Sequence, residues 1–167
     1  KAGQFAKSRA ESCIEKPYKP LPDIIHDKLP LIPNIYFPDY LLFITGLYSV
    51  LLQVKQDYYL NLYTLLCTLL IRPLFICATI LPSCCPKPTK YSSLYSEVFV
   101  STHDLMYSGH TCIFIFLGKI IGGYLGFIVQ FIFPFSLITS RQHYTIDILV
   151  SMLVYNYVWL YLVSIMK

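Results

Sequence analysis

Long apolar segments separated by short polar stretches dominate the chain after its first 38 residues. Their length and composition predict helices at residues 40–54, 58–82, 111–121, 124–139 and 144–166. Gly122 and Gly123 separate two of these segments and predict a tight helical hairpin. Pro73 lies inside the second segment, where it predicts a kink. The pattern therefore indicates an all-α fold.

The composition turns this helical pattern into a membrane prediction. Hydrophobic residues make up 56% of the 167 residues and charged residues only 13%, whereas a soluble domain carries about 25% charge. A helix needs about 20 residues to cross the hydrocarbon core, so the two hairpin helices need flanking residues or a thinned bilayer. We expect an integral membrane bundle of about five spans, with a polar, proline-rich segment at 1–38 and a transmembrane, catalytic-type domain at 39–167.

Charge and cysteine spacing limit the expected partners. The net charge of +4 gives no reason to expect nucleic acid, and the apolar surface predicts contact with membrane lipids. The six cysteines match no zinc or haem pattern, so we expect no metal and no cofactor.

Two motifs carry the candidate chemistry, namely HDLMYSGHT at 103–111 and RQHYTID at 141–147. With five spans, the first 38 residues, the loop at 83–109 and the start of the last helix share one membrane face. The two motifs are therefore predicted to meet at one surface, as a composite active site requires.

The second motif predicts an activated imidazole. His143 and Asp147 are four residues apart at a helix start, so they share one face of the helix. A carboxylate that accepts the proton of one ring nitrogen leaves the other as a nucleophile or base. His110 comes from the first motif and is the candidate acid. This set suits phosphoryl transfer through a phosphohistidine.

Four residues are candidate phosphate ligands. Ser108 and Gly109 precede His110 at a predicted helix start, where backbone N–H groups bind anions. Arg141 supplies positive charge beside His143, and Arg72 lies in an apolar run where an unpaired charge is costly. These candidates also have structural interpretations. Arg72 would reach the membrane rim, and the histidines and Asp147 would be ordinary helix-end groups.

Four stretches resemble one family in the same order along the chain. They are PLPD (20–23), RPLFICATILP (72–82), YSGHT (107–111) and HYTID (143–147). Together they resemble the sphingomyelin synthase and inositol phosphorylceramide synthase family, a branch of the type 2 phosphatidic acid phosphatase superfamily. The resemblance implies the core of a six-span fold.

The resemblance also implies roles and substrates. His143 would be the nucleophile, Asp147 its orienting partner and His110 the general acid and base. Asp104, which ends a Thr-His-Asp stretch where the family has Cys-Gly-Asp, joins the predicted substrate-binding set. The donor would be a phospholipid and the acceptor ceramide.

The departures from the family keep two alternatives open. A missing first span, a short hairpin and the altered stretch before Asp104 favour a non-catalytic subunit of a larger membrane complex. A lipid phosphate phosphatase would use the same residues, but Leu65 stands where related phosphatases have lysine. The family implies the Golgi or plasma membrane. Basic residues on the motif face instead favour a cytoplasmic or matrix orientation, with the mitochondrial inner membrane as the alternative location.

Overall fold

The computed structural model describes residues 21–32, 34, 36–51, 58–79, 81–82, 84 and 106–166. Within these ranges every regular element is a helix, which confirms the predicted all-α class. The elements are α2 (Ile24–Lys28), α3 (Phe37–Leu51), α4 (Tyr58–Ala78), α6 (Gly109–Ile121), α7 (Gly123–Phe127), the π-helix η1 (Ile128–Ile132), α8 (Phe135–Thr139) and α9 (Thr145–Met166).

The predicted helices are present, with ends moved by local chemistry. α3 begins earlier than predicted, at Phe37, with Pro38 in its first turn, where a missing N–H costs nothing. α6 begins at Gly109 because the Ser108 hydroxyl caps it and accepts from the Thr111 N–H at 3.2 Å. α4 continues through Pro73 and ends at Ala78, short of the predicted residue 82.

The predicted hairpin turns at two glycines with left-handed backbones, Gly122 at φ 67° and Gly123 at φ 58°. The helix after the turn is not continuous as predicted, because Pro134 lacks an N–H and separates η1 from α8. The two arms approach closely: a side-chain carbon at Gly126 would lie 2.3 Å from the carbonyl oxygen of Gly118. Glycine at this crossing lets the backbones of α6 and α7 touch.

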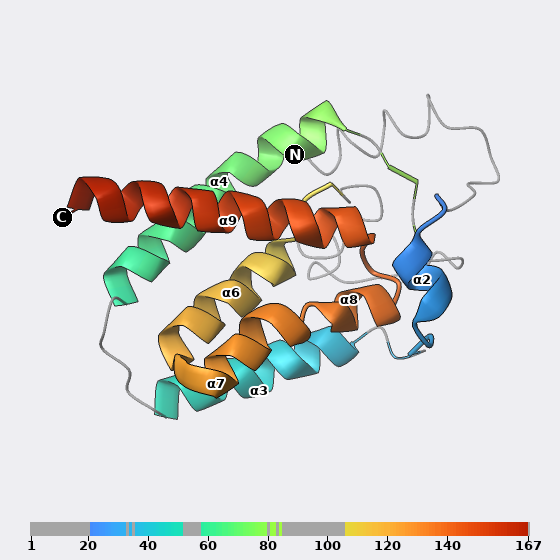
Figure 1. The fold of residues 1–167 in the computed structure, drawn as a ribbon, viewed down its shortest axis with the longest axis horizontal. Helices are drawn as coiled ribbons and strands as arrows, with labels where there is room; N and C mark the ends of the chain where they lie inside the picture. The colour runs from blue at the N-terminus through green and yellow to red at the C-terminus, as the bar shows by residue number, and fades with distance from the viewer. Residues whose placement is uncertain are drawn as a thin grey trace, which may run out of the picture.

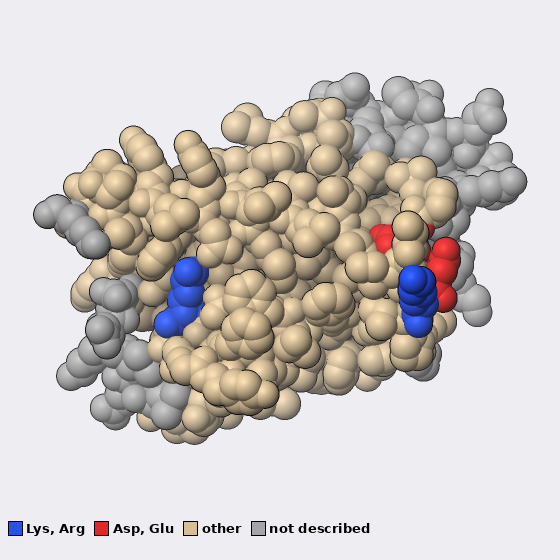
Figure 2. Space-filling model, in the orientation of Figure 1, with Lys and Arg blue, Asp and Glu red and all other residues tan. Residues whose placement is uncertain are grey.

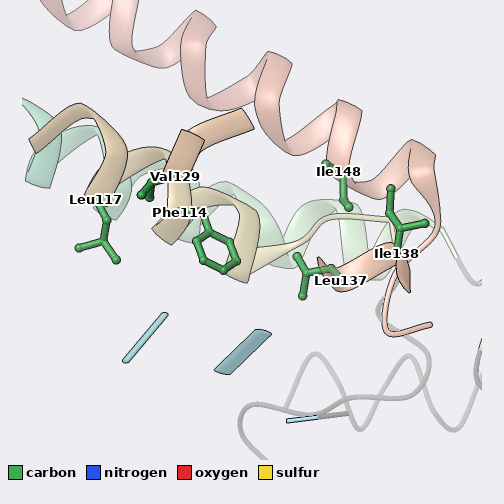
Figure 3. Packing of buried hydrophobic residues seen from close by; sticks show 6 residues of the cluster. All are labelled: Phe114, Leu117, Val129, Leu137, Ile138 and Ile148. Carbon is green, nitrogen blue, oxygen red and sulfur yellow. The ribbon is translucent and has the colours of Figure 1, made fainter. Parts of the chain in front are cut away.

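α6 is the central helix of the bundle and contacts α3, α4, α7, η1 and α9 (Figure 1). Its Phe114 and Leu117 form a buried cluster with side chains from three other elements. Those side chains are Val129 of η1, Leu137 and Ile138 of α8, and Ile148 of α9 (Figure 3). The start of α6 is therefore fixed against the start of α9, where the two motifs lie.

Two helices of the described chain, α4 and α9, are long and apolar enough to cross a membrane by length and composition. Phe37–Leu51, Gly109–Ile121 and Gly123–Thr139 are apolar but shorter. Uncharged side chains cover most of the described surface in Figure 2, with acidic side chains gathered at the α2 end. The five apolar segments are thus in place, and crossing by the three shorter ones stays a prediction.

Candidate active site

His143 and Asp147 form a buried imidazole–carboxylate pair at the start of α9. The His143 Nδ1 lies 3.2 Å from the Asp147 Oδ2. The same oxygen accepts from the Tyr144 N–H at 2.9 Å. Asp147 is 0% exposed and His143 is 8% exposed. Because a carboxylate only accepts, Nδ1 carries the proton and Nε2 is left with its lone pair.

A serine connects this pair to the start of α6. The Ser151 hydroxyl donates to the Asp147 carbonyl at 2.7 Å and accepts from the Ser108 N–H at 2.7 Å. Ser151 is 0% exposed and lies one turn after Asp147. The two motifs therefore meet, as their predicted position on one face requires.

Two N–H groups at the start of α6 are already used in hydrogen bonds within the described chain. The Ser108 N–H is used by Ser151, and the Thr111 N–H is used by the Ser108 side chain. Gly109 and His110 follow the cap, where the backbone N–H groups have no partner within the helix. Of the two predicted anion-binding residues at this helix start, Ser108 therefore has its N–H already occupied.

Arg72 comes from α4 to the same helix start. Its Nε donates to the Tyr107 carbonyl at 3.3 Å. A side-chain carbon at Gly109 would lie 3.8 Å from this Nε. The guanidinium therefore lies beside the backbone of Gly109, where its charge adds to the positive end of α6. This position is compatible with the predicted phosphate role.

His110 has a carboxylate partner that the sequence analysis missed. Its Nε2 lies 3.0 Å from the Asp39 Oδ1, in the first turn of α3. The side chains of His110 and Asp39 are 20% and 26% exposed, so this pair is more accessible than His143 and Asp147. This contact uses Nε2 of His110, and Nδ1 is the other ring nitrogen. The available signal was an acidic residue at the motif end of an apolar segment.

Arg141 is held toward α2. Its Nη2 donates to the His26 carbonyl, and its own carbonyl accepts from the Cys84 thiol at 3.0 Å. Its backbone is left-handed, with φ 57°, which is uncommon for a residue other than glycine. Nη1 is buried without a hydrogen-bond partner in the described chain. Asp104, the remaining predicted ligand, lies outside the described residues.

Asp23 fixes the start of α9 from the N-terminal side. Its carboxylate caps α2 and accepts from the Thr145 N–H at 2.7 Å and the Thr145 hydroxyl at 2.8 Å. Partial burial alone would raise the pKa of Asp23. The hydrogen bonds from Thr145, His26 and Ile25 outweigh burial and hold that pKa below its ordinary value. The charged form is therefore the one that joins α2 to α9.

One comparison with known proteins covers the region of the two motifs. Residues 102–164 match the family model described as PAP2 superfamily C-terminal. This match spans His110, His143 and Asp147 and supports the PAP2 superfamily, whose members are generally enzymes and include phosphatases and phosphotransferases. It does not reach Asp39 or Arg72. No curated protein matches the chain.

The Asp23 contacts predict a pH-dependent difference in stability. Because folding lowers the pKa of Asp23, its stabilisation is present above the unfolded-state pKa and is lost as pH falls through the folded-state pKa. Asp23→Asn should lower the thermal midpoint in detergent at about pH 7, and the gap to wild type should close toward about pH 3.

Asp27→Asn is the matched control. Its side chain is exposed on the same short helix and makes no hydrogen bond to other described residues, so little change is expected at either pH. A gap for Asp23→Asn that stays constant between the two pH values would remove the carboxylate charge from the explanation.

Proposed function

We propose that this chain is a lipid head-group phosphotransferase, which moves a phospho-head-group from a phospholipid to ceramide through a phosphohistidine. The observation that carries the proposal is the buried His143–Asp147 pair, joined through Ser151 to the helix start that holds His110. The match at 102–164 supports the phosphoryl chemistry. The choice of ceramide rests on the four family-like stretches, and the membrane location rests on α4 and α9.

The first half-reaction follows from the free nitrogen of His143. Nε2 attacks the phosphorus of the donor and forms an N–P bond, while the bond from phosphorus to the glycerol oxygen breaks. His110 gives its Nδ1 proton to that oxygen, and diacylglycerol leaves. Asp147 stabilises the positive charge on His143 as the N–P bond forms. Arg72 and the N–H groups of Gly109 and His110 take the phosphoryl oxygens.

The second half-reaction reverses the roles. The primary hydroxyl of ceramide attacks phosphorus, the N–P bond breaks, and the hydroxyl proton passes to His110. His143 and His110 return to their starting protonation states. Asp39 suits both steps, because a carboxylate beside His110 stabilises the imidazolium form that each step uses or makes.

Hydrolysis is the second candidate function, because the PAP2 superfamily also includes phosphatases. Water would replace ceramide in the second half-reaction, and the residues would keep their roles. The acceptor therefore separates the two activities, and the donor step does not.

Transfer activity is the direct test of the proposal. The purified chain, in vesicles with head-group-labelled phospholipid and ceramide, should form labelled phosphosphingolipid. His143→Ala should abolish it, since the variant lacks the proposed nucleophile. Ser164→Ala, at an exposed serine near the far end of α9, is the control and should be fully active.

Three outcomes would contradict the proposal. Label released to water without a ceramide product would select the phosphatase. Full turnover by His143→Ala would overturn the phosphohistidine. No turnover with either acceptor, together with isolation only in a large stable assembly, would select a non-catalytic subunit.

Asp39 should affect turnover through His110. Asp39→Asn keeps the shape of the side chain but removes its charge, so we expect turnover to fall by roughly tenfold or more. The upper limit is the about 10²–10⁴-fold that acid–base catalysis by His110 would supply. KM should change little. Asp147→Asn should cost more, on the order of 10²–10⁴, since it also favours the wrong tautomer of His143.

A double-variant cycle with His110→Ala tests whether Asp39 acts through the imidazole. Once His110 is absent, Asp39→Asn should cause no further loss of turnover, because the two side chains act as a unit. Independent losses that add in the double variant would show that Asp39 acts elsewhere.

A further inference from the structure

A third histidine, His26 of α2, contacts the main chain of the nucleophile. Its Nε2 lies 2.9 Å from the His143 carbonyl oxygen. A carbonyl only accepts, so His26 Nε2–H is the donor. His26 is 7% exposed, and its ring stacks on Tyr144 with the centroids 5.6 Å apart. An imidazole is thus buried against the segment that presents His143, without touching the reacting nitrogen.

The segment that carries His143 lies before the regular helix bonds of α9, and the Leu137 carbonyl accepts from the N–H groups of Gln142 and His143. α9 begins at Thr145, after His143, and the described hydrogen bonds give the His143 carbonyl one partner, His26. Arg141, two residues before His143, has a left-handed backbone. The peptide between His143 and Tyr144 is therefore held by two side chains: Asp147 Oδ2 accepts from its N–H, and His26 of α2 donates to its carbonyl.

Other contacts aim α2 at the same segment. Arg141 donates to the carbonyl of His26, and Asp23 accepts from Thr145. The Tyr144 hydroxyl donates to the Pro82 carbonyl at 2.9 Å and accepts from the Leu21 N–H at 3.0 Å. Burial raises the pKa of Tyr144 to about 12, so the phenol keeps its proton at neutral pH. Arg141 therefore holds the carbonyl of His26, and the His26 ring stacks on a Tyr144 side chain whose hydroxyl is itself hydrogen-bonded.

We propose that His26 is a positioning residue for the nucleophile, which sets the orientation of His143 by holding its carbonyl. This inference rests on the proposed function. His26 would then complete the set of contacts around His143: Asp147 holds ring Nδ1 and the following N–H, and His26 holds the carbonyl. If the peptide rotates, the ring moves with it, and a misplacement of about 1 Å at a reacting atom can lower the rate by roughly 10²-fold.

Two amide substitutions separate positioning from general packing. The amide nitrogen of Gln occupies the place of the histidine Nε2, whereas that of Asn matches Nδ1 and falls short of the carbonyl. His26→Gln should keep most of the wild-type kcat. His26→Asn should lose roughly tenfold to 100-fold in kcat with KM little changed. Both variants lose the ring, so their thermal midpoints should be similar.

His26→Phe provides a second, independent measurement. It keeps a ring to stack on Tyr144 but has no donor, so its kcat should fall as far as that of His26→Asn. Turnover is measured with labelled phospholipid and both acceptors, ceramide and water, per mole of folded protein. Equal kcat for the Gln, Asn and Phe variants, in an active wild-type background, would overturn the positioning role alone. A wild type that uses neither acceptor would overturn the proposed function and this inference together.

Discussion

A buried carboxylate at the start of α9 is the constraint on which the site depends. Asp147 is 0% exposed, and a charge removed from water is costly unless donors surround it. The His143 ring and the Tyr144 N–H both donate to one of its oxygens. These contacts favour the Nδ1–H tautomer of His143 and hold the chain just before the helix, while Oδ1 is buried without a hydrogen-bond partner among the described residues. The carboxylate therefore sets both the local backbone and the chemistry.

The first turns of α9 also hold the first motif in place. Ser151 uses one hydroxyl to satisfy the Asp147 carbonyl and the Ser108 N–H. α6 is held along its length by the glycine contact with α7 and by the cluster around Phe114. Its start therefore has a defined position beside the turn of α9 that carries Asp147. A short hairpin is sufficient for this geometry because the motifs need only meet at one end of the bundle.

The sequence predicted the helices well because each is a long apolar run with a proline, glycine or serine near its end. It also predicted the meeting of the two motifs, since that follows from counting spans. The roles assigned to His110, His143 and Asp147, and to the phosphate ligands, stay predictions. Contacts between distant segments were missed, because the spacing of apolar residues does not show which side chains meet. The missed contacts are Asp39 with His110, His26 with the His143 carbonyl, and Arg141 with the His26 carbonyl. The break before α8 was also missed, although the residue at the break, Pro134, is visible in the sequence.

The central claim is that His143 carries the phospho-head-group between donor and acceptor. The most direct measurement is to mix the purified chain with phospholipid labelled in its phosphate, without acceptor, and to quench within the first turnover in alkali. An acid-labile, alkali-stable label is expected on the peptide that contains His143, and it should disappear when ceramide is added. Label on another residue, or product formed with no labelled intermediate at any time, would contradict it.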